Sequence, residues 1–282
     1  MRPRALEAPY LAGLLLLLAV PALGGIVLAF TDFSGVGAPA FVGLENFARL
    51  AGDGLFWKSL GNSAIYVLVS VPLRLAAAVA FALLLHRHGR GIGSARAIAY
   101  LPTVIPDAAY ALLWLWILNP LYGPLTMGIT ALGGTSPRWL TDPPTTQVAI
   151  AVMGAFQIGE AFVVALAARR AVPSSLYEAA AVDGASPWFA LKRITVPMMA
   201  PILALLALRD VIFTFQMNFV PALVITGGGP RYATLYLPLY MYKTAFGYLR
   251  LGYASAMALV MFALTAIIIF VQYRLARRWR LA

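Results

Sequence analysis

The sequence has no cysteine and only two histidines, and it is poor in charge. Without cysteine, neither a disulfide framework nor a Cys-ligated metal site can form. His86 and His88 stand beside Arg87 and Arg90, a setting that disfavours a His-ligated metal. Charged residues make up 11% of the 282 residues, whereas soluble domains usually contain about 25%. These scarcities argue against a soluble domain and against a metal centre.

Catalytic and nucleotide-binding motifs are missing as well. The run Thr226-Gly227-Gly228-Gly229-Pro230 contains no Lys followed by Ser or Thr, so it is not a phosphate-binding loop. Both histidines lie in one basic turn, which leaves no plausible Ser-His-Asp arrangement. We therefore expect a non-catalytic chain with no cofactor of its own.

What the sequence has in abundance is apolar residues, at 62% of the total. A helix needs about 20 residues to cross a hydrocarbon core of about 30 Å. Arg2 and Arg4 precede a first Leu-rich run that is long enough to be a retained helix rather than a cleaved signal. The sequence predicts an all-α membrane protein, one domain over 1–282, with six transmembrane helices near residues 10–30, 62–85, 97–117, 148–168, 201–225 and 252–271.

The basic residues indicate the orientation of these helices. Most of the 21 Lys and Arg residues flank the side that holds both termini and the linkers near 87–96 and 169–193. Basic flanks face the cytoplasm in multi-pass proteins. We therefore expect both termini in the cytoplasm, and we attribute the net charge of +11 to topology and contact with membrane lipid rather than to nucleic-acid binding.

A polar stretch at 174–197 lies between the fourth and fifth apolar segments. It carries Glu178, Asp183 and Lys192, which a lipid-facing helix would hold only at a high cost. Good helix formers precede Gly184, which permits a backbone reversal, and Pro187 suits the first turn of another helix. We expect two short helices in an L within a cytoplasmic loop.

The spacing of this stretch resembles the cytoplasmic signature of the membrane subunits of bacterial ABC importers. Glu178-Ala179-Ala180 is followed by Gly184 and then by Ile194-Thr195-Val196-Pro197, with Val196 where the family usually has Leu. The resemblance implies that this element docks on an ATP-hydrolysing subunit. Its implied coupling residues are Glu178, Ala179, Ala180, Asp183, Gly184, Ile194 and Pro197.

A second resemblance concerns the Gly-rich loop. Thr226-Gly227-Gly228-Gly229-Pro230 before an aromatic-rich run, together with Leu101-Pro102-Thr103-Val104-Ile105-Pro106, is similar to the first membrane component of maltose-type and glycerol-phosphate-type sugar importers. The resemblance implies that the loop faces an extracytoplasmic solute-binding protein. It also implies a bacterial inner-membrane complex in which a second homologous permease and two ATP-binding subunits, which bind ATP and Mg, move a carbohydrate by alternating access.

Five charged residues fall within or at the edges of the expected spans, namely Arg74, Asp107, Glu160, Arg209 and Asp210. An unpaired charge at mid-bilayer costs about 2.5 to 3.5 kcal/mol on insertion scales. Glu160 with Arg209 and Asp210 with Arg74 are conceivable pairs. They could fix helix packing or form the polar wall of a solute pathway.

Sugar recognition needs amides or carboxylates for hydroxyl groups and an aromatic face for the ring. The candidate pathway residues are Gln157, Glu160, Phe215, Asn218, Arg209 and Arg74. A buried polar stripe can equally hold helices together. Two other functions stay open at this point: import of a phosphorylated polyol or another polar solute, and a proton- or ion-coupled secondary carrier.

Overall fold

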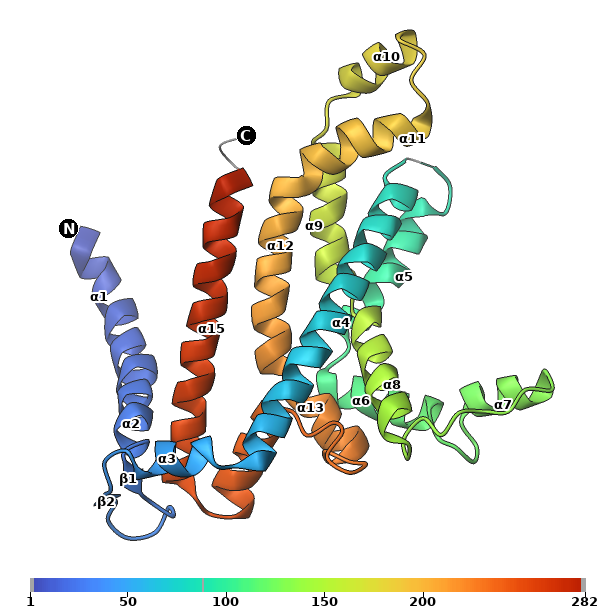
Figure 1. Ribbon diagram of the computed structural model, residues 1–282. Helices are drawn as coiled ribbons and strands as arrows, with labels where there is room; N and C mark the ends of the chain where they lie inside the picture. The colour runs from blue at the N-terminus through green and yellow to red at the C-terminus, as the bar shows by residue number, and fades with distance from the viewer. Residues whose placement is uncertain (1–2, 88, 280–282) are drawn as a thin grey trace. The chain divides into compact units, whose positions relative to one another are not determined.

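The computed structural model describes residues 3–87 and 89–279, so Arg2, His88 and Arg280 lie outside the described residues. The fold is helical apart from one short antiparallel pair of strands (Figure 1). It divides into two compact units. Unit 1 comprises residues 1–58 and 237–267, and unit 2 comprises residues 59–236 and 268–282.

Four helical segments of the described residues are long and apolar enough to cross a membrane, namely Pro9–Leu28, Gly54–Leu85, Pro187–Thr226 and Leu251–Arg274. Two further pairs of helices reach the length and apolar character of a span only when the two members are taken together, and each pair is bent at a short break. The pair α5 (Ile92–Val104) and α6 (Asp107–Ile117) is bent by 101°, and the pair α8 (Pro143–Phe156) and α9 (Gly159–Arg170) is bent by 49°. The predicted spans at 97–117 and 148–168 are therefore broken rather than continuous.

Local chemistry explains both breaks. Ile105 is extended, with φ −71° and ψ 128°, because the residue before a proline avoids the helical region. At the second break Gln157 leaves the helical conformation with ψ 56°. The backbone N–H of Gly159 then donates to Thr103 Oγ1 at 2.8 Å, and a Cβ at Gly159 would lie 2.4 Å from that oxygen. A glycine at this position lets α9 approach α5 closely.

The remaining helices of unit 2 frame these bent pairs. The long helix α4 (Gly54–Leu85) begins at the boundary of the units, and α7 (Pro124–Ala131) lies between α6 and α8 in the chain. Two short helices, α10 (Ser174–Val182) and α11 (Pro187–Ala190), join α9 to α12 (Val196–Met217) through a π-helical turn at Leu191–Thr195. After α12 come α13 (Phe219–Pro221) and a π-helical turn at Ala222–Thr226.

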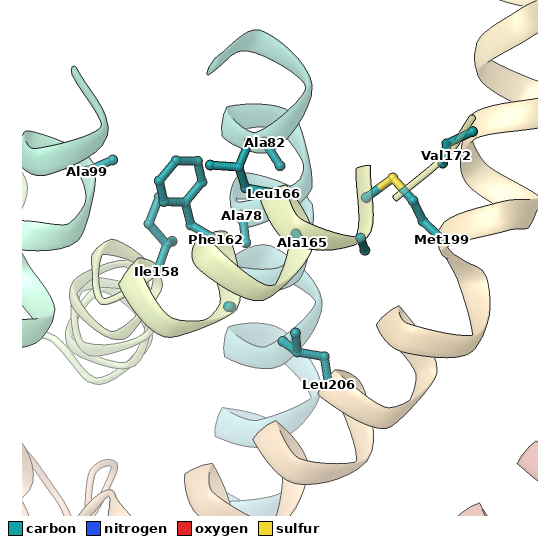
Figure 2. Close-up of a cluster of buried hydrophobic side chains, with 12 residues drawn as sticks. Ala78, Ala82, Ala99, Ile158, Phe162, Ala165, Leu166, Val172, Met199 and Leu206 are labelled. Carbon is teal, nitrogen blue, oxygen red and sulfur yellow. The ribbon is translucent and has the colours of Figure 1, made fainter. Parts of the chain in front are cut away.

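The apolar core of unit 2 is built around α9. Figure 2 shows Phe162 and Leu166 of α9 among small residues of α4, Ala78 and Ala82, with Met199 of α12 nearby. Small side chains let transmembrane helices approach closely, where dispersion contacts rather than the hydrophobic effect hold them. This core fixes α9 between α4, α5 and α12.

Unit 1 contains the N-terminal span and the last one. Its elements are α1 (Pro3–Leu14), a π-helical turn at Leu15–Ala19, α2 (Val20–Leu28), β1 (Thr31–Asp32), β2 (Ala40–Phe41), α3 (Glu45–Ala51), α14 (Leu237–Tyr242), a π-helical turn at Lys243–Gly247 and the first part of α15 (Leu251–Trp279), whose residues after Ile267 belong to unit 2.

Asp53 ties several elements of unit 1 together. Its Oδ1 accepts from the N–H groups of Leu55 and Phe56, and its Oδ2 accepts from the hydroxyls of Tyr240 and Tyr253 at 2.6 and 2.8 Å. Burial alone would raise the pKa of Asp53, but these hydrogen bonds favour the carboxylate and leave the pKa below its ordinary value.

Candidate functional site

A cavity of about 300 Å³ lies within unit 2, and both helix breaks open onto it. Its wall takes residues from α4, α5, α6, α8, α9, α12 and α13, together with Gln157 and Asn218, which end α8 and α12. Of the six predicted pathway residues, five line this cavity: Arg74, Gln157, Glu160, Arg209 and Asn218. The helices thus bring together side chains that are up to 144 positions apart in the sequence (Arg74 to Asn218).

Phe215 does not line the cavity and is buried elsewhere in α12. The aromatic face on the wall belongs instead to Phe213, two residues earlier. Since side chains two positions apart on a helix point in different directions, the choice between these residues depends on how α12 is rotated. Sequence alone does not give that rotation.

Arg74 lies deep in the cavity wall, with its side chain 13% exposed. Its Nη1 contacts Asp210 Oδ1 at 3.1 Å and Thr214 Oγ1 at 3.3 Å, and its Nε donates to the carbonyl oxygen of Gly154 at 3.1 Å. The carbonyl of Gly154 lies in the last turn of α8, where it also accepts a hydrogen bond from the backbone N–H of Gln157 at 3.4 Å. Arg74 therefore joins α4, α8 and α12 in one buried network.

Glu160 and Arg209 form the second predicted pair, which bridges α9 and α12. Both side chains are about half exposed, at 53% and 44%. The guanidinium of Arg209 also stacks over Phe213, with Cζ 4.6 Å from the ring centroid. The pair lies in a solvated part of the cavity, where an ion pair adds little to stability.

Asn218 is 3% exposed, yet neither atom of its amide has a partner among the residues that the structure describes. The same holds for Oδ2 of Asp210. Buried polar groups without a hydrogen bond cost about 1 to 3 kcal/mol each. Because Asn218 lies on the cavity wall, its amide is available to a solute with hydroxyl groups.

The polar stretch 174–197 forms two short helices, as the sequence predicts. Gly184 has φ +74° and follows the last turn of α10. The N–H of Ala185 donates to the carbonyl of Ala180 at 2.8 Å, and the N–H of Gly184 donates to that of Ala181 at 3.1 Å. These two bonds are a Schellman motif, which ends the helix and turns the chain. Ser186 then caps α11, and Pro187 occupies its first turn.

Tyr177 anchors this element to the helices on either side of it. Its hydroxyl lies 2.8 Å from Thr195 Oγ1, just before α12, and Arg169 at the end of α9 stacks over its ring at 4.6 Å. Ile194 and Tyr177 are partly buried against the α9 core. The two helices that leave this element, α9 and α12, are the helices that carry Glu160 and Arg209 to the cavity.

The outer face of the element is unusually apolar for a polar loop. Val182 is 89% exposed, Trp188 62% and Phe189 52%. Glu178, Ala179, Asp183, Gly184 and Pro197 are exposed, and Ala180 is partly so. Large exposed apolar groups grouped on one element mark interaction surfaces.

The loop Thr226-Gly227-Gly228-Gly229-Pro230 is sharply turned and well bonded. Thr234 is fully buried, and its Oγ1 lies 2.6 Å from Thr226 Oγ1 and donates to the Gly229 carbonyl at 2.7 Å. Gly227 and Gly228 have φ of +59° and +93°, and the Gly229–Pro230 bond is cis. Gly227 and Gly228 therefore supply the positive φ angles of a turn that hydrogen bonds hold in place.

Two amides hold the segment after this loop. Asn62 Nδ2 donates to the carbonyl of Tyr232 at 2.7 Å, and Gln147 Nε2 donates to that of Ala233 at 2.9 Å. Asn62 lies on α4 and Gln147 on α8. The loop is therefore fixed to the same helices that build the cavity.

Residues 74–281 match the family model of the "Binding-protein-dependent transport system inner membrane component". The chain belongs to this family. It is an ABC transporter permease, a non-catalytic membrane component, and the family prediction made from the 174–197 spacing is confirmed.

The permease resembles known members over nearly its whole length. It is 32% identical over 280 residues to the probable ABC transporter permease protein YesP of Bacillus subtilis, which covers 98% of this chain and 90% of that one. It is 32% identical over 264 residues to the trehalose/maltose transport system permease protein MalF of Thermococcus litoralis, covering 91% and 87%.

The fold of the permease matches a solved structure closely. A chain of the bacterial alginate ABC transporter, crystallised with its alginate pentasaccharide-bound periplasmic protein, superposes with a TM-score of 0.86. The two chains are 21% identical, and the match covers 98% of this chain and 93% of that one. At that identity the likeness establishes the fold.

Several residues of the permease site have no signal in the sequence. Thr214 and the Gly154 carbonyl complete the Arg74 network, and Tyr177 holds the 174–197 element in place, yet none stands in a recognisable motif. Asp107, predicted only as a charge inside the third span, lines the cavity from the first residue of α6. Contacts between distant helices, rather than spacing, define these roles.

Proposed function

We propose that this permease forms one half of the translocation path of a carbohydrate importer, with a second homologous permease as the other half. The observation that carries the proposal is the cavity with the unpartnered Asn218 amide. Helices α9 and α12 connect this cavity to the separate 174–197 element, which we call the docking element. Two ATP-binding subunits would bind ATP and Mg on the cytoplasmic side. A solute-binding protein would deliver the sugar from outside.

The depth of the cavity supports a position near the middle of the bilayer. Arg209 lies 13 residues after the first residue of α12, and Glu160 lies ten residues before the last residue of α9. At 1.5 Å per residue these separations correspond to about 20 and 15 Å. A hydrocarbon core is about 30 Å thick. With the 174–197 element in the cytoplasm, both side chains would lie near the midplane.

The proposed mechanism is alternating access driven through the docking element. The exposed Val182, Trp188 and Phe189 would enter a cleft on the ATP-binding subunit, with Glu178 fixing the docking geometry. Closure of the ATP-binding subunits would move α10, and the Tyr177 contacts would pass this motion to α9 and α12. The cavity between these helices would then open outward to receive the sugar and return inward after hydrolysis.

The loop 226–230 would meet the solute-binding protein on the opposite side of the membrane. Its fixed turn supports a docking role, because a preorganised surface loses little entropy on binding. A proton- or ion-coupled carrier finds less support in the cavity. Of its carboxylates, Glu160 and Asp210 are each paired with an arginine, which leaves no chain of free acidic groups for an ion relay.

Co-purification tests the assembly directly. Membranes that express the tagged permease with its neighbouring subunits should yield a stoichiometric complex of the permease, a second membrane chain and a soluble ATPase. A variant with Val182→Asp and Trp188→Asp should lose the ATPase but keep the membrane partner. Recovery of the permease alone, from wild-type membranes in mild detergent, would contradict the proposal.

Asn218→Leu separates sugar binding from helix packing. The substitution removes two buried atoms that have no partner, so the unfolding temperature of the assembled complex should stay level or rise. Affinity for the transported sugar should fall about tenfold, the loss expected from about 1.4 kcal/mol of hydrogen bonding. A lower unfolding temperature with unchanged affinity would instead assign Asn218 to packing.

A further inference from the structure

The cavity has a charge pattern that bears on which sugars can enter it. Two guanidinium groups, of Arg74 and Arg209, and three carboxylates, of Asp107, Glu160 and Asp210, line its wall, and no Lys does. The formal charge of the lining is therefore negative by one. The solute pathway of the permease carries arginines without being basic.

Both guanidinium groups are already engaged. Arg74 contacts the carboxylate of Asp210, the hydroxyl of Thr214 and the carbonyl of Gly154. Arg209 pairs with Glu160 and stacks on Phe213. An anionic solute that recruited Arg209 would leave the Glu160 carboxylate beside its own charge. Recruitment of Arg74 would leave Asp210, which is 4% exposed, as a buried unpaired carboxylate.

The polar groups of the cavity wall that have no such partner favour neutral hydroxyl groups over anions. Asp107 forms no ion pair within the described residues, and Oδ2 of Asp210 is an unused acceptor. Asn218 offers an amide NH2 group as donor and a carbonyl oxygen as acceptor, both without a partner among the described residues. Acceptors of this kind suit hydroxyl groups, which can donate to a carboxylate, whereas a carboxylate or phosphate can only repel it.

We propose that this cavity selects uncharged sugars and excludes sugars that carry a carboxylate or phosphate group. The inference rests on the carbohydrate function proposed above and narrows it. It also argues against a phosphorylated polyol, the alternative solute that the sequence left open. Although the permease shares its fold with a chain of an importer of the acidic polysaccharide alginate, its own cavity lacks a free cation among the described residues.

The test uses pairs of sugars that differ only in charge. Maltose, trehalose and lactose, each with its phosphorylated or uronic-acid counterpart, are titrated into the detergent-solubilised complex of both permeases and the ATPases, without the solute-binding protein. At least one neutral sugar should bind, and its anionic counterpart should bind about 100-fold more weakly. Equal or tighter binding of the anionic member would overturn the inference. Failure of every sugar, of either charge, would count against the carbohydrate function itself.

Glu160→Gln provides a gain of function that a packing role would not produce. The substitution frees Arg209, so the affinity for the anionic sugars should rise about tenfold. Glu45→Gln is the matched control, because it frees Arg49 from an exposed pair on α3 in unit 1. This control should leave binding of both sugar classes unchanged. Unchanged anionic affinity in Glu160→Gln would show that the charge of this wall does not set the selectivity.

Discussion

Replacing Arg74 with Met should lower the stability of the assembled permease by about 3 kcal/mol, the largest effect on stability that we expect from any one substitution in the cavity. The loss comes chiefly from Asp210, whose carboxylate is 6% exposed and would stay buried without a cation. The Gly154 carbonyl and the Thr214 hydroxyl would lose their donor as well. Methionine keeps the apolar stem and so avoids a large cavity.

A double substitution isolates the charge. Arg74→Met with Asp210→Leu removes both ions, and replacing a buried pair with apolar groups is often neutral. We therefore expect the double variant to recover most of the stability that Arg74→Met loses. The midpoint of thermal unfolding measures the stability of the single and the double variant. It is read from the fraction of complex that stays monodisperse on heating. Equal losses in the single and double variants would mean that the unpaired carboxylate of Asp210 is not the cause of the loss.

The helical content and the docking element were predictable because short-range chemistry determines them. Long apolar runs predict the helical segments long enough to cross a membrane, and Gly184 and Pro187 predict the turn and the start of α11. The breaks between α5 and α6 and between α8 and α9 were harder to predict from the sequence. Pro106 is a local signal for the first break, because the residue before a proline avoids the helical region. The break at Gln157 depends instead on the contact between Gly159 and Thr103.

The cavity was predictable only in part, for a related reason. Buried charge in an apolar sequence must find a partner, so the pairs Arg74–Asp210 and Glu160–Arg209 could be proposed from composition and depth alone. The sequence could not decide which aromatic residue faces the solute, because that depends on the rotation of α12. Nor could it reveal that Asn218 lacks a partner, since an absent contact is visible only when every neighbour is placed.

Two helices, α9 and α12, connect the cavity to the 174–197 element. The loop 174–197 begins where α9 ends and finishes where α12 begins. Tyr177 of α10 contacts Thr195 before α12 and Arg169 at the end of α9, so a tilt of α10 would act on both helices. Glu160 and Arg209 would then move relative to each other.

Substitution of Gly184 with Val should abolish this coupling while the permease still folds and inserts. A Cβ at Gly184 would meet no atom within 4 Å, so the substitution creates no clash. Its effect is confined to the backbone, because a β-branched residue at φ +74° is strained by about 1 to 3 kcal/mol. Relief of that strain would undo the Schellman turn and change the angle between α10 and α11. We expect sugar uptake to fall at least tenfold while ATP hydrolysis loses its dependence on the solute-binding protein.

Two control variants define the cause. Gly184→Asn should keep most of the uptake, because Asn tolerates the left-handed region. Gly133→Val places the same residue at a similar φ of +78°, also with no atom within 4 Å, in the loop after α7 and outside the docking element. It should leave the ratio of ATP hydrolysed to sugar transported unchanged. Reconstituted proteoliposomes give that ratio, and a wild-type ratio in Gly184→Val would mean that the turn at the end of α10 does not carry force between the ATPase and the cavity.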